Sequence, residues 1–115
     1  MVTIYHNGRC SKSRGALEIL QEKGIPHEVR WYLAEPLSAE EIRDLLQKLG
    51  VRPEAIVRKS EQYFQEALKG KTLDEDTWIS ELAAHPELIE RPIVVNGDKA
   101  VVARPPERVL ELVER

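Results

Sequence analysis

Apolar and polar positions along the chain change period several times, between short runs typical of strands and longer runs typical of helices. Residues 2–5 are predicted to form a first strand. From about 12 to 23, apolar residues recur every three or four positions, which predicts an amphipathic helix. Gly24-Ile25-Pro26 ends that helix, and residues 27–32 alternate in character as a second strand does. Two strands joined by a helix predict a parallel pair with a right-handed crossover.

The middle of the chain is predicted to be helical. Ser38 and Glu41 have the spacing of a capping box, so a helix is expected to begin there and to end at Gly50. Between Pro53 and His85 no segment has a convincing strand pattern. Two or three short helical stretches are expected instead, at 54–57, 61–68 and 75–84, with Asp74 as the cap of the last.

The C-terminal part is predicted to be a β-hairpin followed by a helix. Two β-branched runs, 91–95 and 99–103, flank Asn96-Gly97-Asp98, and Asn-Gly is a strong hairpin signal. Pro105-Pro106-Glu107 then begins the last helix. This order of elements predicts an α/β fold: a thioredoxin-like, glutaredoxin-like mixed four-stranded sheet with flanking helices and a helical insertion at about 38–86. At 115 residues, we expect one domain over 1–115.

Composition excludes several classes of function. The net charge of −3 argues against non-specific binding to nucleic acid. No apolar run reaches the roughly 20 residues that a membrane-spanning helix needs, and strand-like residues begin where a leader peptide would stand. One cysteine cannot form an internal disulfide, so the reducing cytoplasm is the expected compartment. We expect a monomer with neither nucleic-acid nor membrane partners.

Cys10 is the most informative residue. It lies between the first strand and the first helix, where unpaired backbone N–H groups and the helix dipole favour a thiolate, the nucleophilic form. His6, Lys12 and Arg14 make its surroundings electropositive. A lone cysteine in such a protein is more often a small buried apolar residue. The polar neighbours on both sides of Cys10 favour a reactive thiol instead.

Three arginines stand near predicted element ends or in the helical middle: Arg58, Arg91 and Arg104. The planar guanidinium matches a tetrahedral oxyanion and stays charged. If the hairpin lies beside the first strand, Arg91 and Arg104 point at the Cys10 loop from one sheet edge. Each arginine taken singly is more often solvated or ion-paired, and only their joint occurrence favours a site. Pro92 begins a strand, and most X–Pro bonds are trans.

Several motifs together resemble one family. The segment from Tyr5 to Arg14, Tyr-His-Asn-Gly-Arg-Cys-Ser-Lys-Ser-Arg, resembles the His-x3-Cys-x3-Arg signature of the glutathione- and glutaredoxin-coupled arsenate reductases. Later blocks match in order over essentially the whole chain: Leu49-Gly50-Val51, Val57-Arg58-Lys59, His85-Pro86, Ile89 to Val95 and Arg104-Pro105-Pro106-Glu107. The resemblance implies that Cys10 is the nucleophile, that Arg58, Arg91 and Arg104 bind the oxyanion, and that Pro92 is cis.

The chain departs from the family pattern at two places. Gly8 stands where members usually carry proline, and adds backbone freedom to the loop. Ser11-Lys12 stands where Gly-Thr is common, and Lys12 adds a positive charge near the sulfur.

The resemblance further implies the chemistry of an arsenate reductase. Arsenate is the substrate of the Cys10 thiolate, and glutathione is the co-substrate. Glutaredoxin is the partner that regenerates the thiol. Neither a bound cofactor nor a metal is needed. Arg14, the helix start and the Ser13 hydroxyl are expected to stabilise the thiolate or hold substrate. His6 has two open roles, a charged partner of the thiolate or a structural hydrogen bond within the loop.

Two other functions use the same residues differently. A monothiol, glutaredoxin-like thiol-disulfide oxidoreductase would need Cys10 without arsenate, but would leave the three arginines without a clear role. A non-enzymatic redox regulator that binds a protein such as RNA polymerase is the weakest alternative. Regulators on this scaffold use a Cys-x-x-Cys switch, and Ser13 occupies the second cysteine position here.

Overall fold

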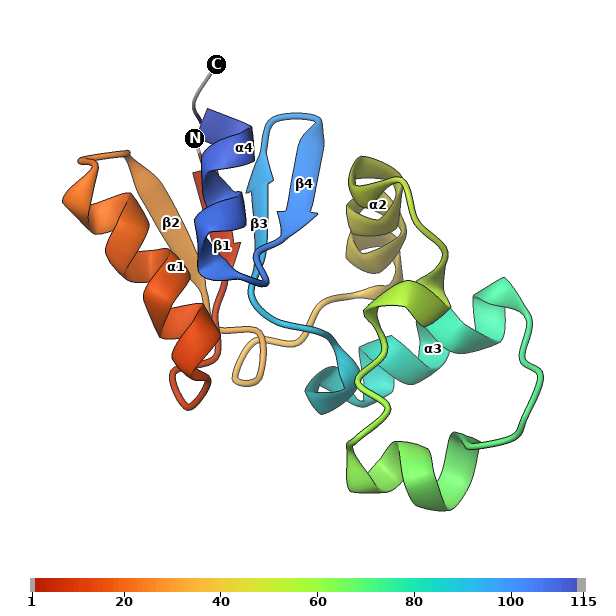
Figure 1. Ribbon diagram of the computed structural model, residues 1–115. Helices are drawn as coiled ribbons and strands as arrows, with labels where there is room; N and C mark the ends of the chain where they lie inside the picture. The colour runs from red at the N-terminus through yellow and green to blue at the C-terminus, as the bar shows by residue number, and fades with distance from the viewer. Residues whose placement is uncertain (1, 114–115) are drawn as a thin grey trace. The chain divides into compact units, whose positions relative to one another are not determined.

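The computed structural model describes residues 2–113 and contains one four-stranded mixed sheet (Figure 1). The strand order is β2-β1-β3-β4. Strand β1 (Val2–Tyr5) pairs in parallel with β2 (His27–Arg30) and antiparallel with β3 (Ile93–Asn96). Strand β4 (Lys99–Val102) completes the predicted hairpin with β3. The predicted α/β fold with a mixed four-stranded sheet and flanking helices is confirmed.

The chain divides into two compact units. The first comprises Met1–Glu35 and Arg91–Arg115, and contains the whole sheet. The second, Pro36–Glu90, is helical and corresponds to the insertion expected at about 38–86. That all 115 residues act as one domain stays a prediction.

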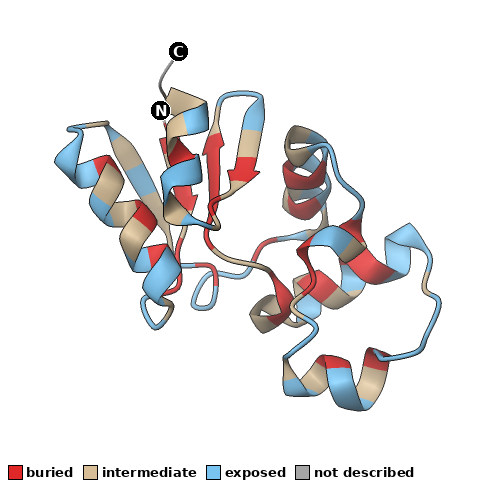
Figure 2. Cartoon of the chain, in the orientation of Figure 1, coloured by how far each residue is buried: buried red, intermediate tan, exposed pale blue. Residues whose placement is uncertain are grey.

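In the first unit, helix α1 (Ser11–Glu22) and the C-terminal helices η4 (Pro106–Val109) and α4 (Leu110–Val113) pack on the sheet. Alternate strand positions face these helices, as the two-residue period of a strand requires. Figure 2 shows the buried positions concentrated along β1 and β3. The buried cluster consists of Val2, Ile4, Ala16, Leu20, Val94, Val101, Ala103 and Val109.

Gly15 permits the close approach of α1 to the C-terminal segment. A Cβ atom at this position would lie 3.0 Å from Cγ and 3.3 Å from Cβ of Pro106. This spacing is tighter than most Cβ contacts, so Pro106 would have to shift by a few tenths of an ångström to accept any larger residue. The contact matters for function because α1 carries the first-turn N–H groups that follow Cys10.

In the second unit, the helix boundaries follow the predicted caps. Ser38 caps α2 (Ala39–Leu49): its hydroxyl accepts the Glu41 N–H, and the Glu41 carboxylate accepts the Ser38 N–H, both at 3.1 Å. Gly50, at φ 69°, ends the helix. The carboxylate of Asp74 caps α3 (Glu75–Ala84). The predicted capping box and the Asp74 cap are both confirmed.

Strand β2 is shorter than expected. It ends at Arg30, not at residue 32, because the Trp31 carbonyl accepts the N–H groups of Ala34 and Glu35 at 3.0 and 2.8 Å. These bonds turn the backbone out of the ladder. The half-exposed Trp31 ring consequently lies beside the loop that precedes α1.

The short helices of the insertion, and the start of the C-terminal helix, differ from ordinary α-helices. Segments η1 (Pro53–Ile56) and η3 (Pro86–Leu88) are 3-10 turns that begin at proline. Segment η2 (Phe64–Leu68) is a π-helix, a wider turn that the apolar spacing does not reveal. The C-terminal helix, expected from Pro105, begins as the 3-10 turn η4. Within residues 2–113, no helix has both the length and the apolar character to cross a membrane.

Candidate functional site

Cys10 is the N-cap residue of α1, with extended backbone angles of φ −96° and ψ 122°. Its carbonyl accepts the Arg14 N–H at 3.0 Å, the first bond of the helix, and its own N–H donates to the Asn7 carbonyl at 3.0 Å. The cysteine side chain makes no capping bond to a backbone N–H, and the first turn of α1 contains no acidic residue. The thiol therefore lies at a positive helix end without a neighbouring carboxylate in that turn.

The surroundings of the Cys10 sulfur favour the thiolate. Partial burial alone would raise the pKa of the thiol. The N–H of Ser13, a hydrogen bond from the Arg91 guanidinium, the N–H of Lys12 and the Arg91 charge all favour the ionised form. Together these outweigh burial and hold the pKa of Cys10 below its usual range. The site thus supplies a nucleophile near neutral pH.

Arg91 reaches the sulfur because β1 pairs with β3. Tyr5, the last residue of β1, lies opposite Ile93, the first residue of β3. The loop after β1 and the two residues before β3 therefore meet at one sheet edge. The hairpin thus lies beside the first strand, which is the arrangement in which Arg91 and Arg104 were expected to point at the Cys10 loop. The Arg91–Pro92 peptide bond is cis, as the family resemblance implies and contrary to the generic expectation for an X–Pro bond.

Arg104 contacts the same edge through the backbone. Its Nη1 atom donates to the Arg91 carbonyl oxygen at 2.9 Å. The neighbouring Ala103 N–H donates to the Pro92 carbonyl, also at 2.9 Å. Arg104 thus fixes the backbone of Arg91, whose guanidinium bonds to the Cys10 sulfur. Its predicted role as a direct oxyanion ligand stays a prediction.

His6 and Ser13 form a buried polar pair beneath the loop. His6 is 3% exposed and Ser13 is fully buried. Nδ1 of His6 and Oγ of Ser13 lie 2.7 Å apart, and Oγ also accepts the Asn7 N–H at 3.0 Å. The Ser13 hydroxyl, predicted to hold substrate, is turned into this network. The backbone N–H of Ser13, not its hydroxyl, favours the ionised form of the Cys10 sulfur.

Burial, together with the nearby charge of Arg14, lowers the pKa of His6 below its usual range. The ring is therefore neutral at neutral pH and supplies no positive charge to the thiolate. It lies edge-on to the Trp31 ring, with centroids 4.8 Å apart and the planes at 74°. Of the two roles left open by the sequence, this geometry favours the structural hydrogen bond.

The lowered pKa of His6 predicts a loss of stability in acid. The unfolded chain binds a proton at about pH 6.5, and the folded chain binds it only at lower pH. The free energy of unfolding should therefore fall as pH drops through 6.5 towards the folded-state pKa, and level off below it. Urea denaturation at a series of pH values measures this slope. In His6→Asn, which keeps a polar group near the Nδ1 position, the His6 component should disappear; an unchanged slope would contradict the assignment.

Arg14 has a different place from the one predicted. Its side chain is exposed, and Nη1 donates to the Gly8 carbonyl oxygen at 2.9 Å. The cation that hydrogen-bonds to the sulfur is Arg91. A residue four positions after an N-cap lies one turn along the helix, where a long side chain reaches back to the loop backbone. The predicted role of Arg14 in stabilising the thiolate stays a prediction.

Arg58 belongs to the second unit. Its backbone N–H donates to the Leu88 carbonyl, and its guanidinium pairs with Glu61 and, at 3.4 Å, with Glu90. These partners come from the residues just after Arg58 and from the end of the insertion. The predicted role of Arg58 in binding the oxyanion stays a prediction.

Sequence reasoning missed two residues that shape the loop. Asn7 is buried: its side-chain oxygen accepts the Arg9 N–H at 2.9 Å, and its carbonyl accepts the Cys10 N–H. An asparagine two residues before a backbone donor is the signature of an Asx turn, so this signal was present in the sequence. Trp31 is the other residue, and it meets the loop only through the pairing of β2 with β1, which gives no local signal.

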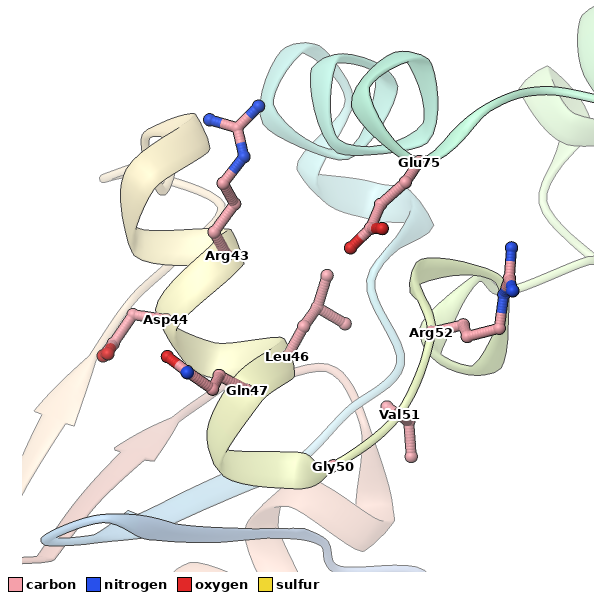
Figure 3. A pocket seen from close by; sticks show the side chains of 8 residues that line it. All are labelled: Arg43, Asp44, Leu46, Gln47, Gly50, Val51, Arg52 and Glu75. Carbon is pink, nitrogen blue, oxygen red and sulfur yellow. The ribbon is translucent and has the colours of Figure 1, made fainter.

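A hollow in the second unit lies between the end of α2 and the start of α3 and has a volume of about 770 Å³ (Figure 3). Its cations have carboxylate partners, since Arg43 pairs with Asp76 at 2.9 Å and Arg52 with Glu54 at 3.6 Å. No nucleophilic side chain lines it. Among residues 2–113, no cluster of three or more histidine, cysteine or acidic residues is arranged to hold a metal ion.

Comparisons with known proteins agree on one family. The model of the ArsC family matches residues 5–112. The chain is 46% identical over 114 residues to the uncharacterized protein YfgD of Escherichia coli strain K12, covering 97% of this chain and 96% of that protein. It is 42% identical over 113 residues to an arsenate reductase of Haemophilus influenzae, covering 96% and 97%. Among solved structures, the arsenate reductase from Vibrio cholerae superposes with a TM-score of 0.93 at 44% identity, covering 96% of each chain.

Proposed function

The chain belongs to the ArsC family, and from that premise we propose that it is an arsenate reductase, an oxidoreductase that converts arsenate to arsenite. The observation that carries the proposal is the hydrogen bond from the Arg91 guanidinium to the Cys10 sulfur at the start of α1. It brings together a thiolate nucleophile and a group that binds oxyanions. The Haemophilus influenzae and Vibrio cholerae relatives support the choice of arsenate.

Arsenate is expected to bind where the positive end of α1 and the Arg91 fork converge. Backbone N–H groups at a helix N-terminus favour anions through their geometry and the helix dipole. A planar guanidinium adds charge-assisted bonds to tetrahedral oxygens. In this proposal Arg104 provides further positive charge for the oxyanion, and it also fixes Arg91 through the 2.9 Å bond to its carbonyl.

Two steps at the sulfur account for the reduction. The Cys10 thiolate attacks arsenic and displaces an oxygen as water, which leaves arsenic in the +5 state in a covalent adduct. The glutathione thiolate then forms a disulfide with the Cys10 sulfur, and arsenite leaves with the electron pair of the broken sulfur–arsenic bond. The two sulfurs are oxidised by one electron each, and arsenic is reduced from +5 to +3.

Regeneration of Cys10 requires an external thiol. The chain has one cysteine, so no internal thiol can attack the Cys10–glutathione disulfide. We assign this step to glutaredoxin, whose thiolate takes the glutathione and releases the Cys10 thiolate. The same proposal places the protein in the reducing cytoplasm as a monomer, with glutathione as a soluble co-substrate and no bound cofactor.

A coupled assay tests the proposal. Purified protein is supplied with arsenate, glutathione, glutaredoxin, glutathione reductase and NADPH, and both NADPH oxidation and arsenite are measured. We expect turnover that stops when arsenate, glutathione or glutaredoxin is omitted. If NADPH is oxidised only with a glutathione mixed disulfide, and never with arsenate, the monothiol oxidoreductase replaces the arsenate reductase as the function.

A further inference from the structure

Two exposed cations, Arg9 and Lys12, flank the nucleophile, one immediately before Cys10 and the other two residues after it. We call this pair the cationic rim. Neither side chain forms an ion pair with any residue between 2 and 113. The nearest cation in the same loop region, Arg14, is engaged with the Gly8 carbonyl. The rim is therefore a solvated positive charge within two residues of Cys10.

The side-chain charges of Arg9 and Lys12 are not what lowers the pKa of Cys10. The charge that lowers the pKa of Cys10 is that of Arg91, and Lys12 contributes its backbone N–H. Asn7 binds the Arg9 backbone N–H, and this bond fixes the backbone of Arg9 while its side chain stays in solvent. Both long side chains are thus exposed to solvent within two residues of Cys10.

We propose that the cationic rim makes Cys10 selective for low-molecular-weight thiols and disulfides that carry carboxylates. The inference deepens the proposed function, on which it rests, because it identifies the property by which the second thiol is chosen. In the exchange, a Cys10 thiolate attacks a disulfide R–S–S–R, forms the Cys10–S–S–R bond and releases R–S⁻. An anionic R group gains from Arg9 and Lys12, whereas a cationic R group is repelled.

The test compares one anionic and one cationic disulfide on the same protein. The rate constants for modification of Cys10 by oxidised glutathione and by cystamine are measured at low ionic strength by mass spectrometry. Their ratio is independent of the thiolate population, because the same thiolate attacks both. In Arg9→Gln and in Lys12→Gln the ratio should fall by about threefold each, the effect of losing one exposed charge interaction. In the double variant the loss should approach tenfold.

Three controls keep the test decisive. Lys99→Gln removes an exposed cation from β4 and should leave the ratio unchanged. The charge-conserving Arg9→Lys and Lys12→Arg should retain the wild-type ratio, which separates charge from packing. High salt should reduce the wild-type ratio towards that of the double variant. A double variant with the wild-type ratio, or a wild-type ratio insensitive to salt, would overturn the proposal.

The outcome is separable from that of the proposed function, since the exchange contains no arsenate. If the ratio depends on charge in a protein without arsenate turnover, the selectivity proposal is supported and the arsenate reductase proposal is rejected. If arsenate is turned over and the ratio is unaffected by Arg9 and Lys12, the arsenate reductase proposal is supported and the selectivity proposal is rejected.

Discussion

Cys10→Ser is expected to lower arsenate-dependent turnover by about four orders of magnitude or more, as loss of a covalent nucleophile does in other enzymes. A serine hydroxyl stays protonated under conditions in which the Cys10 thiol ionises, so no covalent adduct with arsenic can form. Arsenite production in the coupled assay measures the effect. Alkylation gives a second measurement: iodoacetamide should modify the wild-type protein once and inactivate it, because the chain has a single cysteine.

The fold should survive this substitution, which makes a loss of activity interpretable. Cys10 is the N-cap of α1 and makes no capping bond through its side chain. Serine is among the preferred N-cap residues, so the variant should be at least as stable as the wild type in thermal unfolding. Turnover that persists in a folded Cys10→Ser protein would exclude Cys10 as the nucleophile.

Arg91→Gln should have the second largest effect, because Arg91 acts on both the nucleophile and the anion. Losing its hydrogen bond and its charge moves the pKa of Cys10 upward, since burial is then opposed only by the Ser13 and Lys12 N–H groups. A hydrogen bond to a charged group contributes about 1.5–3 kcal/mol, so kcat/KM for arsenate should fall by about ten- to a hundredfold from lost binding alone. The pH profile of iodoacetamide alkylation measures the pKa separately.

Two arginine variants complete the experiment. Arg91→Lys keeps the charge but loses the planar fork, so the alkylation profile should shift less than in Arg91→Gln, while arsenate turnover stays impaired. Arg108→Gln removes an exposed arginine of the same unit, paired with Glu111 at 3.2 Å, and should leave both measurements unchanged. An Arg91→Gln profile identical to that of the wild type would show that the guanidinium does not set the state of the thiol.

The parts of the fold that local interactions determine were predictable from the sequence. Ser38 and Glu41 satisfy each other within one turn, and Gly97, at φ 65°, opens the two-residue turn between the paired residues Asn96 and Lys99. The same holds for the position of Cys10 between a strand and a helix. These signals depend on residues a few positions apart, which is why the spacing alone reveals them.

The environment of the thiol was only partly predictable. Arg14 follows Cys10 by four residues in the sequence, yet its side chain bonds to the Gly8 carbonyl, while Arg91 bonds to the sulfur. Which arginine reaches Cys10 depends on the register of β1 against β3, a long-range property that residue spacing does not encode. The burial of His6 and the orientation of the Ser13 hydroxyl likewise depend on packing beneath the loop.

The pairing of β1 with β3 also has a consequence during biosynthesis. The sulfur emerges from the ribosome near the start of translation, whereas Arg91 emerges only near the end. Until β3 joins β1, Cys10 lacks the guanidinium that favours its ionised form. An unfinished chain therefore carries a thiol that is less ionised at neutral pH than the thiol in the completed sheet. The thiol reaches its full reactivity only when β3 has paired with β1. The rate of Cys10 alkylation therefore reports when a newly made molecule has completed its sheet.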